Sequence, residues 1–130
     1  MIQLDTNALI RRELIPHKLS QPARSAIEAA VGAGEAIAIS SITLWEIALL
    51  TGRSRIQLKV PIAKIFKENE DNYTVFEITG AIAIQAEKLQ LPFPKDPMDR
   101  LIAATAIVKD LTLITADQAI LDSKVCNLVW

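Results

Sequence analysis

Short apolar runs alternate with stretches of helical periodicity along this chain. Apolar runs of strand length fall at residues 2–5, 36–40, 73–78, 112–115 and 127–130. Between them, apolar side chains recur at helical spacing over residues 8–15, 21–31, 42–50, 61–71, 80–90, 98–109 and 117–121. Strands that alternate with helices predict a parallel sheet covered by helices on both faces.

Residues that start and stop helices fall at the ends of these stretches. Pro16 is expected to end the first helix, because proline lacks the backbone N–H that a helix needs. Ser40 and Ser41 are suited to cap the third helix, since a serine hydroxyl accepts a hydrogen bond from the first free N–H groups. The proline-rich segment 91–97 predicts an extended, stiff connection into the next helix.

The composition indicates one globular domain over residues 1–130. Hydrophobic residues make up 51% and aromatic residues only 5%, so we expect a core of aliphatic side chains. The single cysteine, Cys126, is expected in a buried C-terminal strand and cannot form an intrachain disulfide. Neither a signal peptide nor a membrane span is recognisable, and we therefore expect a cytoplasmic protein.

The charge is unevenly distributed although the net charge is only −1. No acid occurs between Glu46 and Glu68, whereas the basic residues of this segment are Arg53, Arg55, Lys59, Lys64 and Lys67. One interpretation is a solvated helix face with a loop. The other is a patch that follows a phosphate backbone, with Arg53, Arg55 and Lys59 as the candidate RNA-binding residues, and it needs an independent reason to expect a nucleic acid.

Four acidic residues are predicted at one edge of the sheet. Asp5 ends the first strand, and Asp117 follows the strand at residues 112–115. Glu46 lies about one turn into the helix after the second strand, and Asp99 lies in the first turn of its own helix. Ligands of open α/β sheets bind beyond the carboxyl ends of the strands, which is where these side chains are expected to meet.

Each of these acids except Glu46 also has a simple structural explanation. Asp5 and Asp117 could each cap the helix that follows. Asp96 precedes Pro97 and is expected to be an N-cap, which leaves open an auxiliary role at the site. Asp99 would then stand at the third helical position, where an acid is favoured by the helix dipole.

Glu46 is harder to explain, because its neighbours on the helix are apolar and Trp45 beside it is expected to pack in the core. A buried glutamate is costly unless a cation pairs with it. Either Arg100 or a metal ion could supply that charge.

A cluster of carboxylates predicts a hard divalent cation. Neighbouring carboxylates repel one another unless a cation neutralises them, and oxygen ligands without histidine or cysteine pairs select Mg²⁺ or Mn²⁺. The lone His17 is expected in a solvated loop. Thr6, Asn7 and Thr115 could hold metal-bound waters or a phosphate oxygen, although Thr6 and Asn7 are also ordinary turn residues. Such a site is suited to hydrolysis of a phosphodiester.

Four segments of the chain resemble, in order, the signature segments of the PIN-domain family. They are residues 4–9 (LDTNAL), 41–48 (SITLWEIA), 95–104 (KDPMDRLIAA) and 113–117 (LITAD). The third is similar to the Asp-Pro-Phe-Asp-Arg segment of VapC-type toxins in bacterial toxin–antitoxin systems. Asn7 stands where many of these toxins have histidine, and Met98 replaces the usual phenylalanine; neither change removes a carboxylate.

The resemblance implies a three-layer α/β/α sandwich with five parallel strands in the order 3-2-1-4-5. It implies an Mg²⁺- or Mn²⁺-dependent endoribonuclease whose acids match Asp5, Glu46, Asp99 and Asp117. It also implies a homodimer and a cognate antitoxin that inserts a segment into the active-site groove.

Three other functions are compatible with parts of the sequence. A haloacid-dehalogenase-like phosphatase would need a second aspartate at Asn7, and a response-regulator receiver would need one after the third strand, where Thr79 follows Ile78. A PIN-fold module without catalysis, which would bind RNA or a protein, would be expected to have lost part of the acidic set.

Overall fold

The computed structural model describes residues 1–130 and contains one parallel β-sheet. Its strands are β1 (Ile2–Leu4), β2 (Ile37–Ser40), β3 (Thr74–Phe76), β4 (Thr112–Ile114) and β5 (Leu128–Val129). They lie in the order β3-β2-β1-β4-β5, and every neighbouring pair is parallel. The predicted sheet and strand order are therefore confirmed, and all carboxyl ends of the strands lie at one edge.

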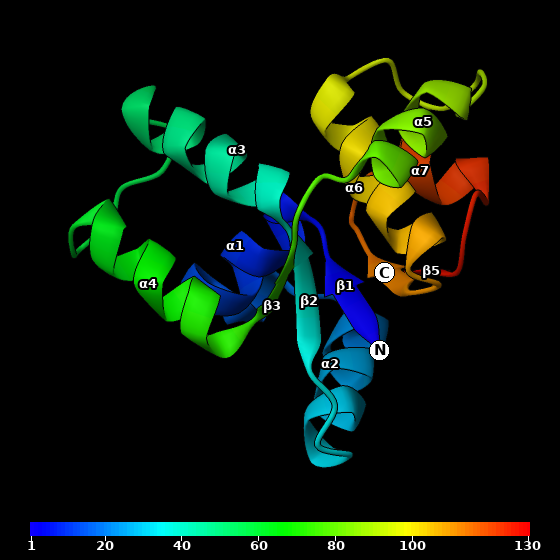
Figure 1. Cartoon of the computed structure of the whole chain (residues 1–130). Helices are drawn as coiled ribbons and strands as arrows, with labels where there is room; N and C mark the ends of the chain where they lie inside the picture. Colours follow the sequence, from blue (N-terminus) through cyan, green and yellow to red (C-terminus); the bar gives the residue numbers. More distant parts are fainter.

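Helices cover both faces of this sheet (Figure 1). They are α1 (Thr6–Leu14), α2 (Gln21–Gly32), α3 (Ser41–Gly52), α4 (Ile62–Asn72), α5 (Gly80–Lys88), α6 (Pro97–Val108) and α7 (Gln118–Ser123). Figure 1 shows α1, α3 and α4 on one side of the strands and α5, α6 and α7 on the other. None of these helices is both long enough and apolar enough to cross a membrane.

Side chains of alternate strand residues pack into two separate cores, one on each face of the sheet. In β1, Ile2 and Leu4 belong to a core that packs against α1, α2 and α4. Ala38 of β2 and Leu113 of β4 point to the other face, into a core formed with α6 and α7. Because both faces of the sheet are buried in this way, the fold is the predicted three-layer α/β/α sandwich.

Two local expectations differ from the structure. Residues Pro16–Lys18 form a short 3-10 helix instead of an irregular loop, since proline is compatible with the start of a helical turn. Cys126 lies before β5 and not within it, and its side chain is only half-buried. Partial burial still raises the pKa of the Cys126 thiol to about 11.

Candidate active site

Asp5 lies directly after β1 and caps helix α1. Its Oδ1 atom accepts a hydrogen bond from the Ala8 N–H at 2.7 Å, and the side chain is buried. Burial raises the pKa of the Asp5 carboxyl to about 6, although hydrogen bonds from Thr115 and Ala8 oppose this increase. The expected capping role is therefore present, and the cap hydrogen bond uses Oδ1.

Asp96 and Asp99 both belong to the start of α6. Asp96 is the N-cap, and its Oδ1 accepts from the N–H groups of Met98 at 2.8 Å and Asp99 at 3.4 Å. Asp99 lies in the first turn, half-buried. Burial raises the pKa of Asp99 to about 7, and the negative charges of Asp96, Asp117, Glu46 and Asp5 contribute to the increase.

Asp117 is the N-cap of α7 and is tied to the end of β4. Its Oδ1 accepts from the Ile120 N–H at 3.2 Å, and its own N–H donates to the Thr115 hydroxyl at 3.1 Å. The structural explanation for Asp117 therefore holds as well. Its charge nevertheless acts on both Asp5 and Asp99, which places it beside them.

Glu46 has no cationic partner. The guanidinium of Arg100, the expected alternative to a metal, donates instead to the backbone carbonyls of Leu89 at 2.5 Å, Glu87 at 3.2 Å and Pro94 at 3.3 Å. The only ion pair in the structure joins the Met1 amino group to Glu35 at 3.4 Å. Burial raises the pKa of Glu46, and the charge of Asp96 adds to this effect.

Two threonines lie among these acids. Thr6 is buried, its hydroxyl lies 3.2 Å from that of Thr43, and its hydrogen bond to Glu46 lowers the pKa of that carboxyl. Thr115 is buried and hydrogen-bonds Asp5. Asn7 is exposed in the first turn of α1. The structure therefore brings Thr6 and Thr115 to the acids, as expected for supporting groups.

The donor set fits a hydrated divalent cation. Four carboxylates act on one another electrostatically, and no positive side chain neutralises them. No group of three or more His, Cys, Asp or Glu side chains lies close enough together to hold a metal ion by itself. Mg²⁺ commonly uses only one or two carboxylates and keeps several waters, so an open acidic cluster of this kind suits it better than a closed cage would.

The surroundings of the acids differ from expectation at Trp45. The Trp45 side chain is 57% exposed and does not pack in the core. Helix α3 is apolar on all sides, so the sequence did not reveal which face is buried; only Thr43 and Ile47 are buried.

The three predicted RNA-binding residues are exposed. They are Arg53, Arg55 and Lys59, and they lie in the connection between α3 and α4.

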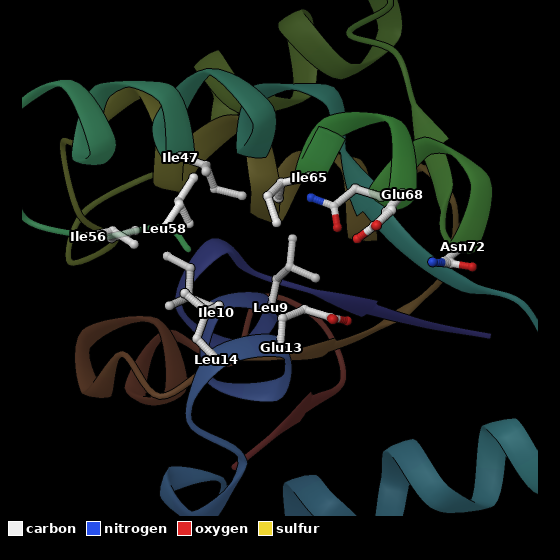
Figure 2. A pocket seen from close by; sticks show the side chains of 11 residues that line it. Leu9, Ile10, Glu13, Leu14, Ile47, Ile56, Leu58, Ile65, Glu68 and Asn72 are labelled. Atoms are coloured by element: carbon white, nitrogen blue, oxygen red, sulfur yellow. The ribbon is translucent and has the colours of Figure 1, made fainter. Parts of the chain in front are cut away.

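A hollow, which we call the α1–α4 groove, lies apart from the candidate site, and none of Asp5, Glu46, Asp99 and Asp117 lines it. It has a volume of about 200 Å³ and is lined by Leu9, Ile10, Glu13, Leu14, Ile47, Ile56, Leu58, Ile65, Glu68, Asn69 and Asn72. Figure 2 shows side chains of α1 pointing toward Ile47, Leu58 and Ile65 across this space. Sequence reasoning missed the groove, and the signal was the pair of apolar residues, Ile56 and Leu58, inside the basic connection.

Comparisons with known proteins agree with this fold. The family model described as PIN domain matches residues 2–124. The chain is 34% identical over 117 residues to a protein named Ribonuclease VapC22 from Mycobacterium tuberculosis, a match that covers 90% of this chain and 87% of that protein.

Solved structures share the fold at lower sequence identity. A chain of VapBC2 from Rickettsia felis, bound to a DNA fragment from the promoter, is 23% identical with a TM-score of 0.71, covering 98% of this chain and 97% of that one. A chain of DNA-bound VapBC from Salmonella typhimurium is 19% identical with a TM-score of 0.67, covering 98% and 97%. A chain of a toxin–antitoxin complex from Klebsiella pneumoniae is 24% identical with a TM-score of 0.63, covering 90% and 87%.

Proposed function

Since this chain belongs to the PIN-domain family, we propose that its 130 residues form one PIN domain that acts as a metal-dependent endoribonuclease toxin of the VapC type. The observation that carries the proposal is the gathering of Asp5, Glu46, Asp99 and Asp117 without a positive partner. A cation is the simplest means of neutralising them, and Mg²⁺ or Mn²⁺ is the class that oxygen ligands select.

The roles of the side chains follow from their positions. When bound, Mg²⁺ or Mn²⁺ lowers the pKa of a coordinated water and offsets the charge that builds up on the phosphate during hydrolysis. Asp5 and Asp99 would hold the cation, since burial raises the pKa of each carboxyl and no positive side chain pairs with either. Glu46 and Asp117 would hold or orient water, with Thr6 and Thr115 fixing the carboxylates of Glu46 and Asp5.

This proposal is tested by measuring how the wild-type protein cleaves single-stranded RNA with Mn²⁺, with Mg²⁺ and with a chelator. Cleavage with either metal and none with the chelator is expected. Metal binding without cleavage of any RNA would favour the non-catalytic PIN module instead. Because RNA is the proposed substrate, we propose that the protein acts in the cytoplasm.

The exposed basic connection after α3 supports an RNA contact. We expect the double variant Arg53→Glu/Arg55→Glu to bind RNA about tenfold more weakly at roughly 0.1 M salt, because it loses phosphate contacts, and to show a shallower salt dependence. RNA binding is measured in the Asp99→Asn background so that the RNA stays intact.

The matched control for the basic connection is Lys18→Glu/Arg24→Glu, which reverses two exposed or partly exposed charges near the 3-10 helix. It should leave RNA affinity nearly unchanged. If both double variants lose affinity equally, the contact is a general charge effect and the assignment of Arg53 and Arg55 is wrong.

The α1–α4 groove supports an antitoxin partner. A solved structure with this fold is described as a toxin–antitoxin complex. We propose that an amphipathic, aliphatic segment of the antitoxin occupies the α1–α4 groove, and not the acidic site as the family resemblance implies. Leu14 lines it and is 44% exposed, so Leu14→Asp should not disrupt the core. We expect this variant to bind the antitoxin at least about tenfold more weakly, because a charge would be buried at the contact.

The control for the groove is Val31→Asp on α2, since Val31 is similarly exposed, at 54%, but lies outside the groove. Co-purification with a candidate antitoxin from the neighbouring reading frame, followed by calorimetry, measures both variants. Full antitoxin affinity in Leu14→Asp would show that the antitoxin binds elsewhere.

We also propose that the protein forms a homodimer. The exposed apolar side chains of Trp45, Ile84 and Leu91 offer contact area for a second copy of the chain.

A further inference from the structure

Gln3 is a fully buried amide in the central part of the sheet. It lies in β1 with no exposed surface, and its side chain points to the α6 face, since Ile2 and Leu4 on either side of it belong to the opposite core. Its Nε2 donates a hydrogen bond to the backbone carbonyl of Ile102 at 3.0 Å. Its Oε1 has no hydrogen-bond partner. The side chain therefore makes one directional contact, to α6.

This contact joins the two elements that carry the principal acids. Asp5 follows Gln3 at the end of β1, and Asp99 lies about one helical turn before Ile102 in α6. A shift of α6 along its own axis would move Asp99 relative to Asp5. The hydrogen bond from Gln3 opposes that shift, because the carbonyl of Ile102 would have to leave its donor.

The other side-chain contacts between α6 and the sheet are apolar. They come from small or aliphatic side chains such as Ala103 and Ala106 of α6 against Ala38 and Leu113. Such contacts are not directional. The remaining side-chain hydrogen bonds of α6 run within the helix or to the segment around α5, so the bond from Gln3 is the only side-chain hydrogen bond between α6 and the strands.

We propose that Gln3 is a positioning residue, which fixes α6 against β1 and so sets the spacing of Asp5 and Asp99 for a divalent cation. The inference rests on the proposed metal-dependent function. Mg²⁺ demands near-ideal octahedral geometry, so a small displacement of one carboxylate reduces its affinity. Residues that support metal ligands typically contribute about 10–100-fold to metal affinity or activity.

A positioning role and a purely structural role give different results in Gln3→Met. Methionine has a similar unbranched shape and removes the unpartnered Oε1 along with the bond to Ile102. The loss of the bond to Ile102 is offset by removal of the buried, unpartnered Oε1, so the metal-free fold is expected to stay about as stable as the wild type. Stability and metal affinity should therefore change independently, whereas a residue that only supported the core would lower both together.

The test compares wild type, Gln3→Met and Thr105→Val. Thr105 is a matched control. It is fully buried, like Gln3, but it lies on α6 and its hydroxyl donates to the Leu101 carbonyl within the same helix at 2.8 Å. Mn²⁺ affinity is measured by calorimetry, urea stability is measured with a chelator, and backbone hydrogen exchange of α6 is measured without metal. We expect Gln3→Met to keep its urea midpoint, to lose about tenfold in Mn²⁺ affinity and to exchange faster at the start of α6.

Thr105→Val should keep the wild-type Mn²⁺ affinity. Wild-type Mn²⁺ affinity in Gln3→Met, or an unchanged exchange rate in α6, would overturn the positioning role. Failure of the wild-type protein to bind Mn²⁺ would count against the proposed function. In that case, the backbone hydrogen exchange of α6 in Gln3→Met and in the wild type would still decide whether Gln3 fixes α6 against β1. Gln3→Leu provides a second variant with a different shape, and it is expected to behave in the same way as Gln3→Met.

Discussion

Asp99→Asn is expected to abolish Mn²⁺-dependent RNA cleavage while making the metal-free protein more stable. The loss of activity should be at least about 100-fold, because even residues that only support a metal ligand contribute up to about that much. The gain in stability follows from the environment of Asp99, since its pKa of about 7 means that ionisation is opposed by burial and by four neighbouring acids. Asparagine has the same shape and no charge.

The pKa of Asp99 limits how much the free energy of unfolding can increase in Asp99→Asn. The difference between a pKa of about 7 and the ordinary value of 3.8 corresponds to roughly 4 kcal/mol of opposition to ionisation at high pH. Asp99 is only half-buried, so water screens part of this, and we expect an increase of roughly 1–2 kcal/mol in the free energy of unfolding at about pH 8. Urea unfolding with a chelator measures it.

The control for Asp99→Asn is Asp71→Asn, an exposed acid near the end of α4. It should change neither cleavage nor stability appreciably. A destabilised Asp99→Asn that still cleaves RNA at the wild-type rate would refute both parts of the expectation, because the carboxylate would then be a structural group and not a metal ligand.

The second large effect is an inverted dependence of stability on pH. Asp5 and Asp99 have raised pKa values, of about 6 and about 7, in the folded protein, against an ordinary value of 3.8. As the pH falls through about 7 and then 6, the folded state takes up protons that the unfolded chain does not, so lowering the pH favours folding. Above about pH 8 both carboxylates are ionised in both states, and the full cost of their charge is present.

Without metal, we therefore expect the free energy of unfolding to be roughly 2 kcal/mol higher at about pH 5.5 than at about pH 8. Excess Mn²⁺ should reverse this, because the cation binds the ionised carboxylates and its affinity rises with pH. Urea titrations at both pH values, with chelator and with Mn²⁺, measure the four stabilities. A metal-free protein that is more stable at pH 8 would show that these acids are not the dominant titrating groups.

Features encoded by neighbouring residues were predictable from the sequence. The parallel sheet follows from strands that alternate with helices, whereas its strand order was expected only from the family resemblance. The start of α6 follows from Asp96-Pro97, whose cap is formed within three residues. Asp5 and Asp117 show why the site itself was harder to predict. Each forms the cap that local sequence suggests and also lies in the acidic cluster, so local pattern alone could not separate the two roles.

Features that depend on contacts between distant segments were not predictable. The partner of Arg100 is a set of backbone carbonyls at the end of α5 and in the following loop, which any sequence would present equally. The burial of Trp45 was predicted wrongly, because α3 is apolar on every face and its periodicity does not indicate which face is buried. The bond between Gln3 and Ile102 joins residues that are far apart in the chain, and only packing of α6 on β1 brings them together.

Direct measurement of Mn²⁺ binding tests whether the carboxylates form a cation site. Calorimetry of the wild type and of Asp99→Asn at about pH 7, in two buffers with different ionisation enthalpies, gives both the affinity and the number of protons released. We expect the wild type to bind Mn²⁺ and to release protons, because Asp5 and Asp99 have pKa values of about 6 and about 7. In Asp99→Asn we expect at least about tenfold weaker binding and less proton release. Equal affinity and equal proton release in the two proteins would contradict a cation site at these carboxylates.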